Sequence, residues 1–147
     1  DIPLQKFPTE KNFTDSELAI TYAVNHGFKA LVFFGAFGTR IDHFLANIDF
    51  LVKKAEEGVK VTIIDNHQTL CFITSQLEIQ GKKGDYLSLI PLQKDVEVVL
   101  TDGLKWVLSQ DTLRWGETRG VSNEFTKTKA KIVIKKGILL AIHAPRP

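Results

Sequence analysis

Methionine is absent from this 147-residue sequence, and cysteine occurs only once, as Cys71. A lone cysteine excludes a disulfide framework, and its place in an apolar, strand-like run favours a reducing, cytoplasmic location. No apolar run is long enough to cross a bilayer and no signal peptide is visible, so we expect no membrane partner. Because the first residue is Asp1, we interpret the sequence as a fragment or a chain whose true start is not shown.

The net charge of the sequence is also small. The 19 Lys and Arg residues nearly balance the 17 Asp and Glu residues, which leaves a formal net charge of +2. This value is too close to neutrality to indicate a nucleic-acid or anionic-membrane partner. Hydrophobic residues, by contrast, make up 44% of the sequence. That share supports a real core, and the length suffices for one domain or two small ones.

The first half of the sequence alternates between strand-like and helix-like patterns. We expect, in order, a strand end over 2–7, a helix between Thr14 and Gly27, a strand over 30–34, a helix from Asp42 to about Glu57 and a strand over 61–64. Thr14 and Glu17 have the spacing of a capping box, and Gly27 and Gly58 follow the two helices as stop signals. Strands that alternate with helices predict a parallel sheet with right-handed crossovers.

The loop from Gly35 to Arg40 joins an apolar strand to the second predicted helix. Glycines there let backbone amides approach a phosphate, and the helix N-terminus adds partial positive charge. Arg40 offers a fork of donors, and Asp42 in the first helical turn could hold a metal ion. Together these residues fit a nucleotide-phosphate site with a divalent cation. Taken singly, these residues favour a tight turn, a charge on the helix dipole or an Arg40–Asp42 ion pair, and only their combination at the end of an apolar strand makes the phosphate site an equal alternative.

Asp15 and Asp42 are expected at one edge of the sheet, because each follows a strand in the predicted order. Ligands of open parallel sheets bind beyond the carboxyl ends of the strands. Two carboxylates that meet there would repel each other unless a cation lay between them. Mg²⁺ is the natural choice, since it takes oxygen ligands and commonly bridges substrate phosphates.

After Asp65 the pattern changes to short strand candidates separated by turn signals. These candidates cover residues 69–73, 77–79, 86–90, 96–100, 104–108, 130–134 and 138–142. Their spacing predicts an antiparallel sandwich that packs closely on the first part, with a boundary between 66 and 75. From spacing alone, the polar cluster at 120–124 favours a turn, and Trp106 and Trp115 are expected in the core.

Three motifs, in the same order along nearly the whole chain, resemble the thiamine pyrophosphokinase family. They are residues 11–19, residues 35–43 with Asn47, and a third set that runs from 87–92 through 103–105 to 121–124. The resemblance implies an α/β plus all-β fold. A Rossmann-like parallel α/β catalytic part, incomplete here, would cover 1–70, and an antiparallel β-sandwich thiamine-binding domain would cover 71–147. The resemblance also implies a homodimer with active sites shared between subunits.

The resemblance further implies transfer of pyrophosphate from ATP to the hydroxyl of thiamine, with Mg²⁺ as cofactor and with thiamine diphosphate and AMP as products. The catalytic residues would be Asp15, Arg40 and Asp42, of which the two aspartates also bind the metal. The ATP-binding residues would be Gly35, Gly38, Thr39, Arg40 and Asn47, and the thiamine-binding residues would be Ser122 and Asn123.

The sequence departs from the family pattern in two places. Asn12 occupies a position where the family usually has an aspartate. The Gly-Asp-x-Asp-Ser motif that family members carry upstream, with further metal-binding aspartates, does not occur. Two other functions therefore stay open: a non-catalytic module that binds thiamine or a nucleotide, and a metal-dependent phosphohydrolase that uses the same pair of aspartates.

Overall fold

The computed structural model describes residues 12–36, 38, 40–65 and 67–146. The elements in chain order are α1 (Asp15–Asn25), β1 (Ala30–Phe34), α2 (Ile41–Glu56), β2 (Lys60–Ile64), β3 (Thr69–Ile73), β4 (Gln76–Gln80), β5 (Tyr86–Pro91), β6 (Val96–Asp102), β7 (Ser109–Leu113), β8 (Asn123–Glu124), β9 (Lys129–Lys136) and β10 (Leu139–Ala144). The strand end expected over 2–7 lies outside the described residues. Neither α1 nor α2 is long and apolar enough to cross a membrane.

The two helices begin and end close to the positions that the sequence predicts. The Thr14 hydroxyl accepts a hydrogen bond from the backbone N–H of Glu17 at 3.2 Å, which is one half of the predicted capping box. Gly27 after α1 and Gly58 after α2 have left-handed φ angles of 87° and 86°. Glycine adopts this conformation without the steric cost that a Cβ atom would add, so both glycines end their helices as predicted.

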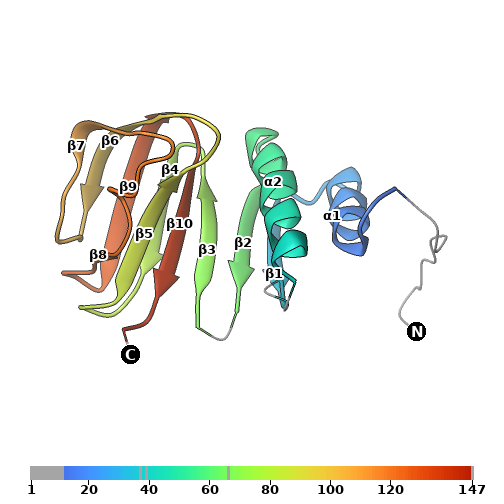
Figure 1. Ribbon diagram of the computed structural model, residues 1–147, viewed down its shortest axis with the longest axis horizontal. Coiled ribbons are helices and arrows are strands. Elements are labelled where there is room, and N and C mark those ends of the chain that lie inside the picture. The colour runs from blue at the N-terminus through green and yellow to red at the C-terminus, as the bar shows by residue number, and fades with distance from the viewer. Residues whose placement is uncertain (1–11, 37, 39, 66, 147) are drawn as a thin grey trace.

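One six-stranded sheet, in the order β1-β2-β3-β10-β5-β8, runs through the whole molecule (Figure 1). β1 and β2 are parallel, as the alternation of strands and helices predicts, whereas β3 pairs antiparallel with both β2 and β10. The predicted succession of a parallel α/β part and an antiparallel β part is therefore confirmed, and both parts share this sheet. The division predicted between residues 70 and 71 lies inside β3, so strand pairing joins the two parts.

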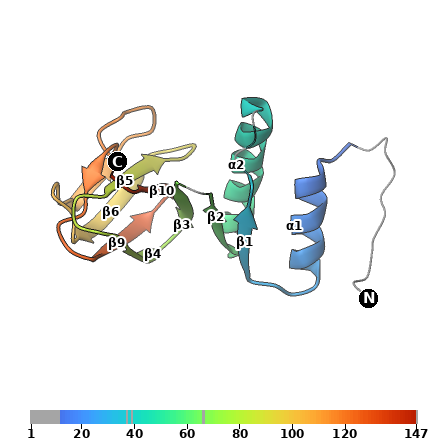
Figure 2. The ribbon, with the colours of Figure 1, turned by 90° about the horizontal axis from the view of Figure 1, so that it is seen from below.

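The shared sheet has a hydrophobic core on each face, because side chains alternate along a strand. In β3, Leu70 and Phe72 pack in the core beneath the helices, whereas Cys71 and Ile73 pack in the core of the sandwich. Helix α2 contributes to the first core a buried stripe at helical spacing, formed by Ile48, Leu51, Val52 and Ala55. Helix α1 lies beyond α2, at the end of the molecule away from the second sheet, and contributes Ile20 to the same core (Figure 2).

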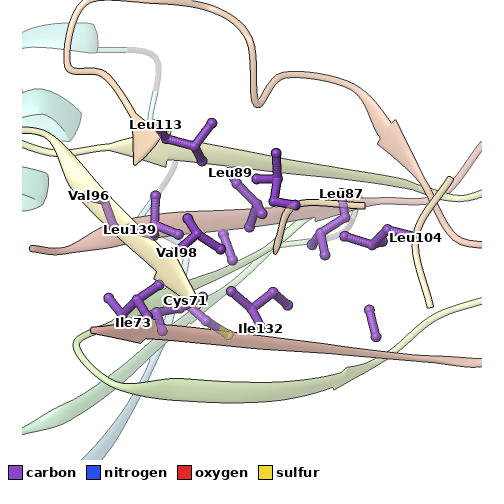
Figure 3. Packing of buried hydrophobic residues seen from close by; sticks show 14 of the residues in the cluster. Cys71, Ile73, Leu87, Leu89, Val96, Val98, Leu104, Leu113, Ile132 and Leu139 are labelled. Atoms are coloured by element: carbon purple, nitrogen blue, oxygen red, sulfur yellow. The ribbon is translucent and has the colours of Figure 1, made fainter. Parts of the chain in front are cut away.

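A second sheet, in the order β4-β9-β6-β7, closes the sandwich over the antiparallel strands of the first. Figure 3 shows the side chains between the two sheets, with Cys71, Ile73 and Leu139 from the first sheet and Val98 and Ile132 from the second. Leu139 and Ile132 are fully buried. The predicted antiparallel sandwich is confirmed, and the α/β part packs on it through the strands that both contain.

The prediction of a strand over residues 104–108 is wrong. The chain turns at Gly103, where φ is 78°, and the next strand is β7 at Ser109–Leu113. The side chain of Thr101 holds the turn closed, because its hydroxyl accepts the backbone N–H of Leu108 at 2.9 Å. β7 is an edge strand with a polar sequence, so it lacks the apolar pattern on which the prediction depended.

The two tryptophans are not core residues, contrary to expectation. The exposed fraction is 54% for Trp106 and 63% for Trp115. Both lie in loops, Trp106 between β6 and β7 and Trp115 after β7. Leu104 and Leu108 take the buried positions in the first of these loops. The indole of Trp106 is therefore available at the surface.

Candidate functional site

The loop between β1 and α2 borders a cavity of about 270 Å³. Four of the predicted ATP-binding residues line it, namely Gly35, Gly38, Arg40 and Asn47. The other lining residues are Ser16, Phe33, Ala36 and His43. Thr39, the fifth predicted residue, lies outside the described residues. The structure thus brings the described part of the predicted phosphate site together in one place.

The backbone of this loop is shaped for a sharp exit from the strand into the helix. Gly35 has a left-handed φ of 70°, which favours glycine at this position. Arg40 precedes α2 with an extended backbone, and no side-chain hydrogen bond caps the helix. The N-terminal amides of a helix carry partial positive charge and are satisfied by acceptors from outside the helix. An anion in the cavity would provide such acceptors.

Arg40, which lines this cavity, forms an ion pair with Asp42. Arg40 donates from Nε to Oδ1 of Asp42 at 3.2 Å and from one terminal nitrogen to Oδ2 at 2.5 Å. The hydrogen bond from Arg40 lowers the pKa of the Asp42 carboxyl, which is therefore ionised at neutral pH. Both side chains are well exposed, and this geometry uses two of the five N–H groups of the guanidinium.

The predicted meeting of Asp15 and Asp42 stays a prediction. Ser16, the neighbour of Asp15 in the first turn of α1, lines the cavity, so the N-termini of both helices are close to it. Neither aspartate is itself a lining residue. No three His, Cys, Asp or Glu side chains within the part of the chain that the structure describes are grouped closely enough to hold a metal ion.

Sequence reasoning assigned no role to four lining residues of this cavity, namely Ser16, Phe33, Ala36 and His43. Two of them have a recognisable place in the sequence pattern, since Ser16 follows the first residue of α1 and Phe33 belongs to the strand that precedes Gly35. His43 and Asn47 are four residues apart on α2, and this spacing places them on one face of a helix.

A second, larger cavity of about 690 Å³ lies at the opposite edge of the six-stranded sheet, where Ser122 and Asn123 border it. The remaining lining residues are Leu89, Lys105, Trp106, Val107, Leu108, Arg119, Gly120 and Val121. The cavity therefore joins an aromatic ring, apolar side chains and polar groups, a combination typical of small-molecule sites.

The segment before Asn123 is held tightly against β5. Ser122 has a left-handed φ of 60°, an uncommon conformation for a residue with a side chain. Its backbone N–H donates to the Ser88 hydroxyl at 3.0 Å. A Cβ atom at Gly120 would lie 2.1 Å from the carbonyl oxygen of Leu89, so only glycine fits there. This cluster is a tertiary junction, and not merely the local turn that spacing alone favours.

Asn123 is buried, and its side chain bonds to a distant loop. Its Oδ1 accepts the backbone N–H of Trp106 at 3.0 Å and that of Glu124 at 2.9 Å, and its Nδ2 donates to the carbonyl oxygen of Trp106 at 2.7 Å. An asparagine amide has two acceptor sites and two donor hydrogens. These contacts fill both acceptor sites and one donor, which leaves one N–H for a ligand.

Each cation at this cavity has a carboxylate partner. Lys105 lies 3.2 Å from Glu124 and places its ammonium nitrogen 4.6 Å from the ring centroid of Trp106. Arg119 makes two hydrogen bonds to Asp111, and these lower the pKa of the Asp111 carboxyl. The charges around the cavity are therefore balanced, which suits a planar ligand with both polar and apolar parts.

Both cavities lie at the same end of the six-stranded sheet but at opposite edges. The strand register places Phe34, the last residue of β1, in one row with Asn123 of β8, through Ile64, Thr69, His143 and Leu87. Neighbouring strands are about 4.8 Å apart, so the five steps of this row separate the two edges by about 24 Å.

Two family models match the chain. One is described as the thiamin pyrophosphokinase catalytic domain and matches residues 1–63, and the other is described as the thiamin pyrophosphokinase vitamin B1 binding domain and matches residues 73–139. Thiamine pyrophosphokinase from Bacillus subtilis (strain 168) is 31% identical over 144 residues, which cover 96% of this chain and 67% of the relative.

Solved structures give the same result. The crystal structure of thiamine pyrophosphokinase from Bacillus subtilis matches with a TM-score of 0.85 at 30% identity, covering 94% of this chain and 66% of that one. The crystal structure of thiamin pyrophosphokinase from Geobacillus thermodenitrificans matches with a TM-score of 0.81 at 29% identity, covering 95% and 65%. The chain thus spans about two thirds of the length of these relatives.

Proposed function

Since the chain belongs to the thiamine pyrophosphokinase family, we propose that it transfers pyrophosphate from ATP to the hydroxyl of thiamine, giving thiamine diphosphate and AMP. One observation carries this proposal. A single sheet presents, at one end, a cavity lined by glycines and Arg40 beside β1 and a cavity lined by Trp106 with apolar and polar groups beside β8, which supports a phosphate ligand in the first and an aromatic, polar ligand in the second. The two substrates of the proposed reaction match these two cavities, since ATP carries phosphates and thiamine carries aromatic rings with polar groups.

The cavity beside β1 is the proposed ATP site. Gly35 and Gly38 would let backbone amides approach the phosphates, and Arg40 and Asn47 would donate to phosphate oxygens from the helix. Thr39 is a further proposed contact on sequence grounds. Arg40 and the positive end of α2 would stabilise negative charge that moves toward the leaving AMP during transfer.

Mg²⁺ enters this proposal as part of the ATP substrate. Asp15 and Asp42, in the first turns of α1 and α2, are the proposed carboxylates for the ion. Oxygen ligands suit Mg²⁺, which is commonly held by one or two carboxylates together with substrate phosphates. Because Asp42 bonds to Arg40 in the structure, binding of the Mg²⁺–ATP complex would require Arg40 to turn toward the phosphates.

The cavity beside β8 is the proposed thiamine site. The amide of Asn123 has one N–H left, so it would donate to an acceptor of the aminopyrimidine ring. Ser122 borders the same cavity, and its hydroxyl can both donate and accept. The indole of Trp106 and the apolar side chains would cover the rings of thiamine.

The separation of the two cavities supports a homodimer with shared active sites. Reacting atoms must approach to about 3–3.5 Å, whereas the two sheet edges of one chain are about 24 Å apart. A second copy that places its β8 edge beside the β1 edge of the first would bring thiamine to ATP. We propose that each active site forms in this way, and that the dimer is cytoplasmic, consistent with one buried, unpaired cysteine.

Product analysis tests the proposed reaction. The chain is incubated with thiamine and Mg²⁺–ATP, and nucleotides and thiamine esters are separated. We expect AMP and thiamine diphosphate in equal amounts, with no AMP when thiamine is left out. Release of orthophosphate without thiamine would indicate a phosphohydrolase instead. Binding of both substrates without turnover would indicate a non-catalytic binding module.

A further inference from the structure

We propose that Asn123 is a positioning residue, whose amide fixes the backbone of Trp106 and so sets the aromatic wall of the cavity beside β8. The assignment of thiamine as the ligand rests on the proposed function, but the positioning itself is a property of the chain alone. It goes beyond a direct contact between Asn123 and the ligand, because three of its four hydrogen-bonding positions serve other residues.

The amide of Asn123 takes the place of a strand neighbour for Trp106. Segments 103–105 and 124–126 run antiparallel, since Thr126 donates to the carbonyl oxygen of Gly103 at 2.8 Å and Lys105 donates to that of Glu124 at 2.9 Å. At the next position the backbone of Asn123 pairs with Leu87 of β5 instead. Its side chain then reaches back and bonds both the N–H and the carbonyl oxygen of Trp106.

This arrangement restrains a residue that would otherwise be loosely held. The indole of Trp106 is about half exposed and belongs to a loop between strands. Its neighbour Lys105 is held by Glu124 and lies over the indole ring. The amide of Asn123 holds the backbone between them, and being buried it meets little competition from water. Backbone and ring are thus both fixed before any ligand arrives, which lowers the entropic cost of binding.

The fluorescence of Trp106 tests the positioning without any ligand. In the 147-residue chain, Trp115→Phe leaves Trp106 as the only tryptophan. We expect Asn123→Ala in this background to raise the amplitude of fast depolarisation of Trp106 about twofold, because the loop loses its two side-chain bonds. Ser122→Ala is the matched control: it borders the same cavity, its hydroxyl makes no bond to Trp106, and it should leave the depolarisation unchanged. An unchanged depolarisation in Asn123→Ala would overturn the proposal.

A double-mutant cycle then asks whether Asn123 acts through Trp106. Thiamine affinity is measured by calorimetry for Asn123→Ala, Trp106→Ala and the double variant. If Asn123 acts by positioning the ring, its replacement should weaken binding about tenfold in the parent and less than about twofold once Trp106 is alanine. Losses that multiply in full would overturn the positioning role and favour a direct contact alone.

Two further measurements separate a failure of the positioning role from a failure to fold or to bind thiamine. If Asn123→Ala does not fold, Asn123→Asp keeps a side-chain oxygen to accept the N–H groups of Trp106 and Glu124 but loses the donor to the Trp106 carbonyl oxygen, so it should still raise the depolarisation of Trp106; no rise would overturn the proposal. If the parent chain shows no thiamine binding, the proposed function fails, whereas the ligand-free fluorescence still decides the positioning role.

Discussion

Two arginine–aspartate pairs mark the two cavities at the scale of single residues. Arg40 and Asp42 pair beside the proposed ATP site, and Arg119 and Asp111 pair beside the proposed thiamine site. Each pair has two hydrogen bonds, which Arg40 makes through Nε and one terminal nitrogen and Arg119 makes through both terminal nitrogens. Each arginine is thus a control for the other. Replacing them one at a time and comparing the changes in ATP and thiamine affinity tests which ligand each cavity binds.

Arg40→Lys keeps the charge but loses the planar fork that matches phosphate oxygens. We expect it to weaken ATP binding about fivefold to tenfold, measured by calorimetry, with thiamine affinity nearly unchanged. Folding should be little affected, because the pair with Asp42 is exposed. Arg119→Lys should leave ATP affinity as it is. Equal losses of ATP affinity in both variants would contradict the assignment of the phosphate site.

We expect Asp85 to contribute to the acid sensitivity of the fold. It is buried and accepts hydrogen bonds from the Lys82 N–H at 2.8 Å, from His143 Nε2 at 2.9 Å and from the Arg146 N–H at 3.2 Å. The backbone bond from Lys82 lowers the pKa of Asp85 most, and the bond from His143 adds to this effect. A carboxyl whose pKa is lower when folded stabilises the protein above its unfolded pKa, and this contribution disappears as the pH falls through the folded pKa.

Asp85→Asn should therefore lower the free energy of unfolding by about 1–3 kcal/mol at pH 7, because buried donors lose a charged acceptor. The wild-type chain loses this contribution as the pH falls below the unfolded carboxyl pKa of about 4 and through the lower folded pKa of Asp85, so the two stability curves should converge at the acidic end of this range. Urea unfolding at several pH values measures both effects. As a control, Asp102→Asn removes an exposed partner of Lys127 and should cost far less at pH 7. Parallel curves for wild type and Asp85→Asn would refute this role.

At the scale of elements, local signals in the sequence predicted the parts of the fold that local chemistry determines. The N-cap at Thr14 and the glycines after both helices set the bounds of α1 and α2. The strand at 104–108 failed because a turn at Gly103 is closed by tertiary contacts, which an apolar run does not reveal. In the same way, the bond between Asn123 and Trp106 spans 17 residues, so no local pattern could show that this cluster holds a neighbouring loop.

The contact between the loop at Gly120 and β5 is the clearest element-scale test. A Cβ atom there would lie 2.1 Å from the carbonyl oxygen of Leu89, and the N–H of Leu89 also donates to the carbonyl oxygen of Gly120 at 2.8 Å. Gly120→Ala should destabilise the chain by about 2–3 kcal/mol, measured by urea unfolding, and should weaken thiamine binding by moving the loop. Gly38→Ala is the control, because its nearest neighbour would be 4.0 Å away. Unfolding curves that coincide for both variants would rule out the close contact.

At the scale of the whole molecule, one continuous sheet fixes the positions of the two proposed substrate sites. Because β3 belongs both to the core under α2 and to the core of the sandwich, the β1 and β8 edges are held at a fixed separation. Closing the two edges on each other within one chain would require breaking strand pairs of this sheet. In the proposed dimer, association of two copies would bring opposite edges together without any change of fold.

Complementation between two inactive variants tests this arrangement most directly. Asp42→Asn should lower turnover about a hundredfold, and Asn123→Ala should raise the Michaelis constant for thiamine, so each variant alone is nearly inactive at low thiamine. In mixed dimers with shared sites, one of the two sites contains both original residues. After subunit exchange, thiamine-dependent AMP formation should return to about a quarter of the wild-type rate, since half of the dimers are mixed and half of their sites are intact. No recovery, with exchange confirmed by differently tagged chains, would contradict a pyrophosphokinase site built from opposite edges of two copies.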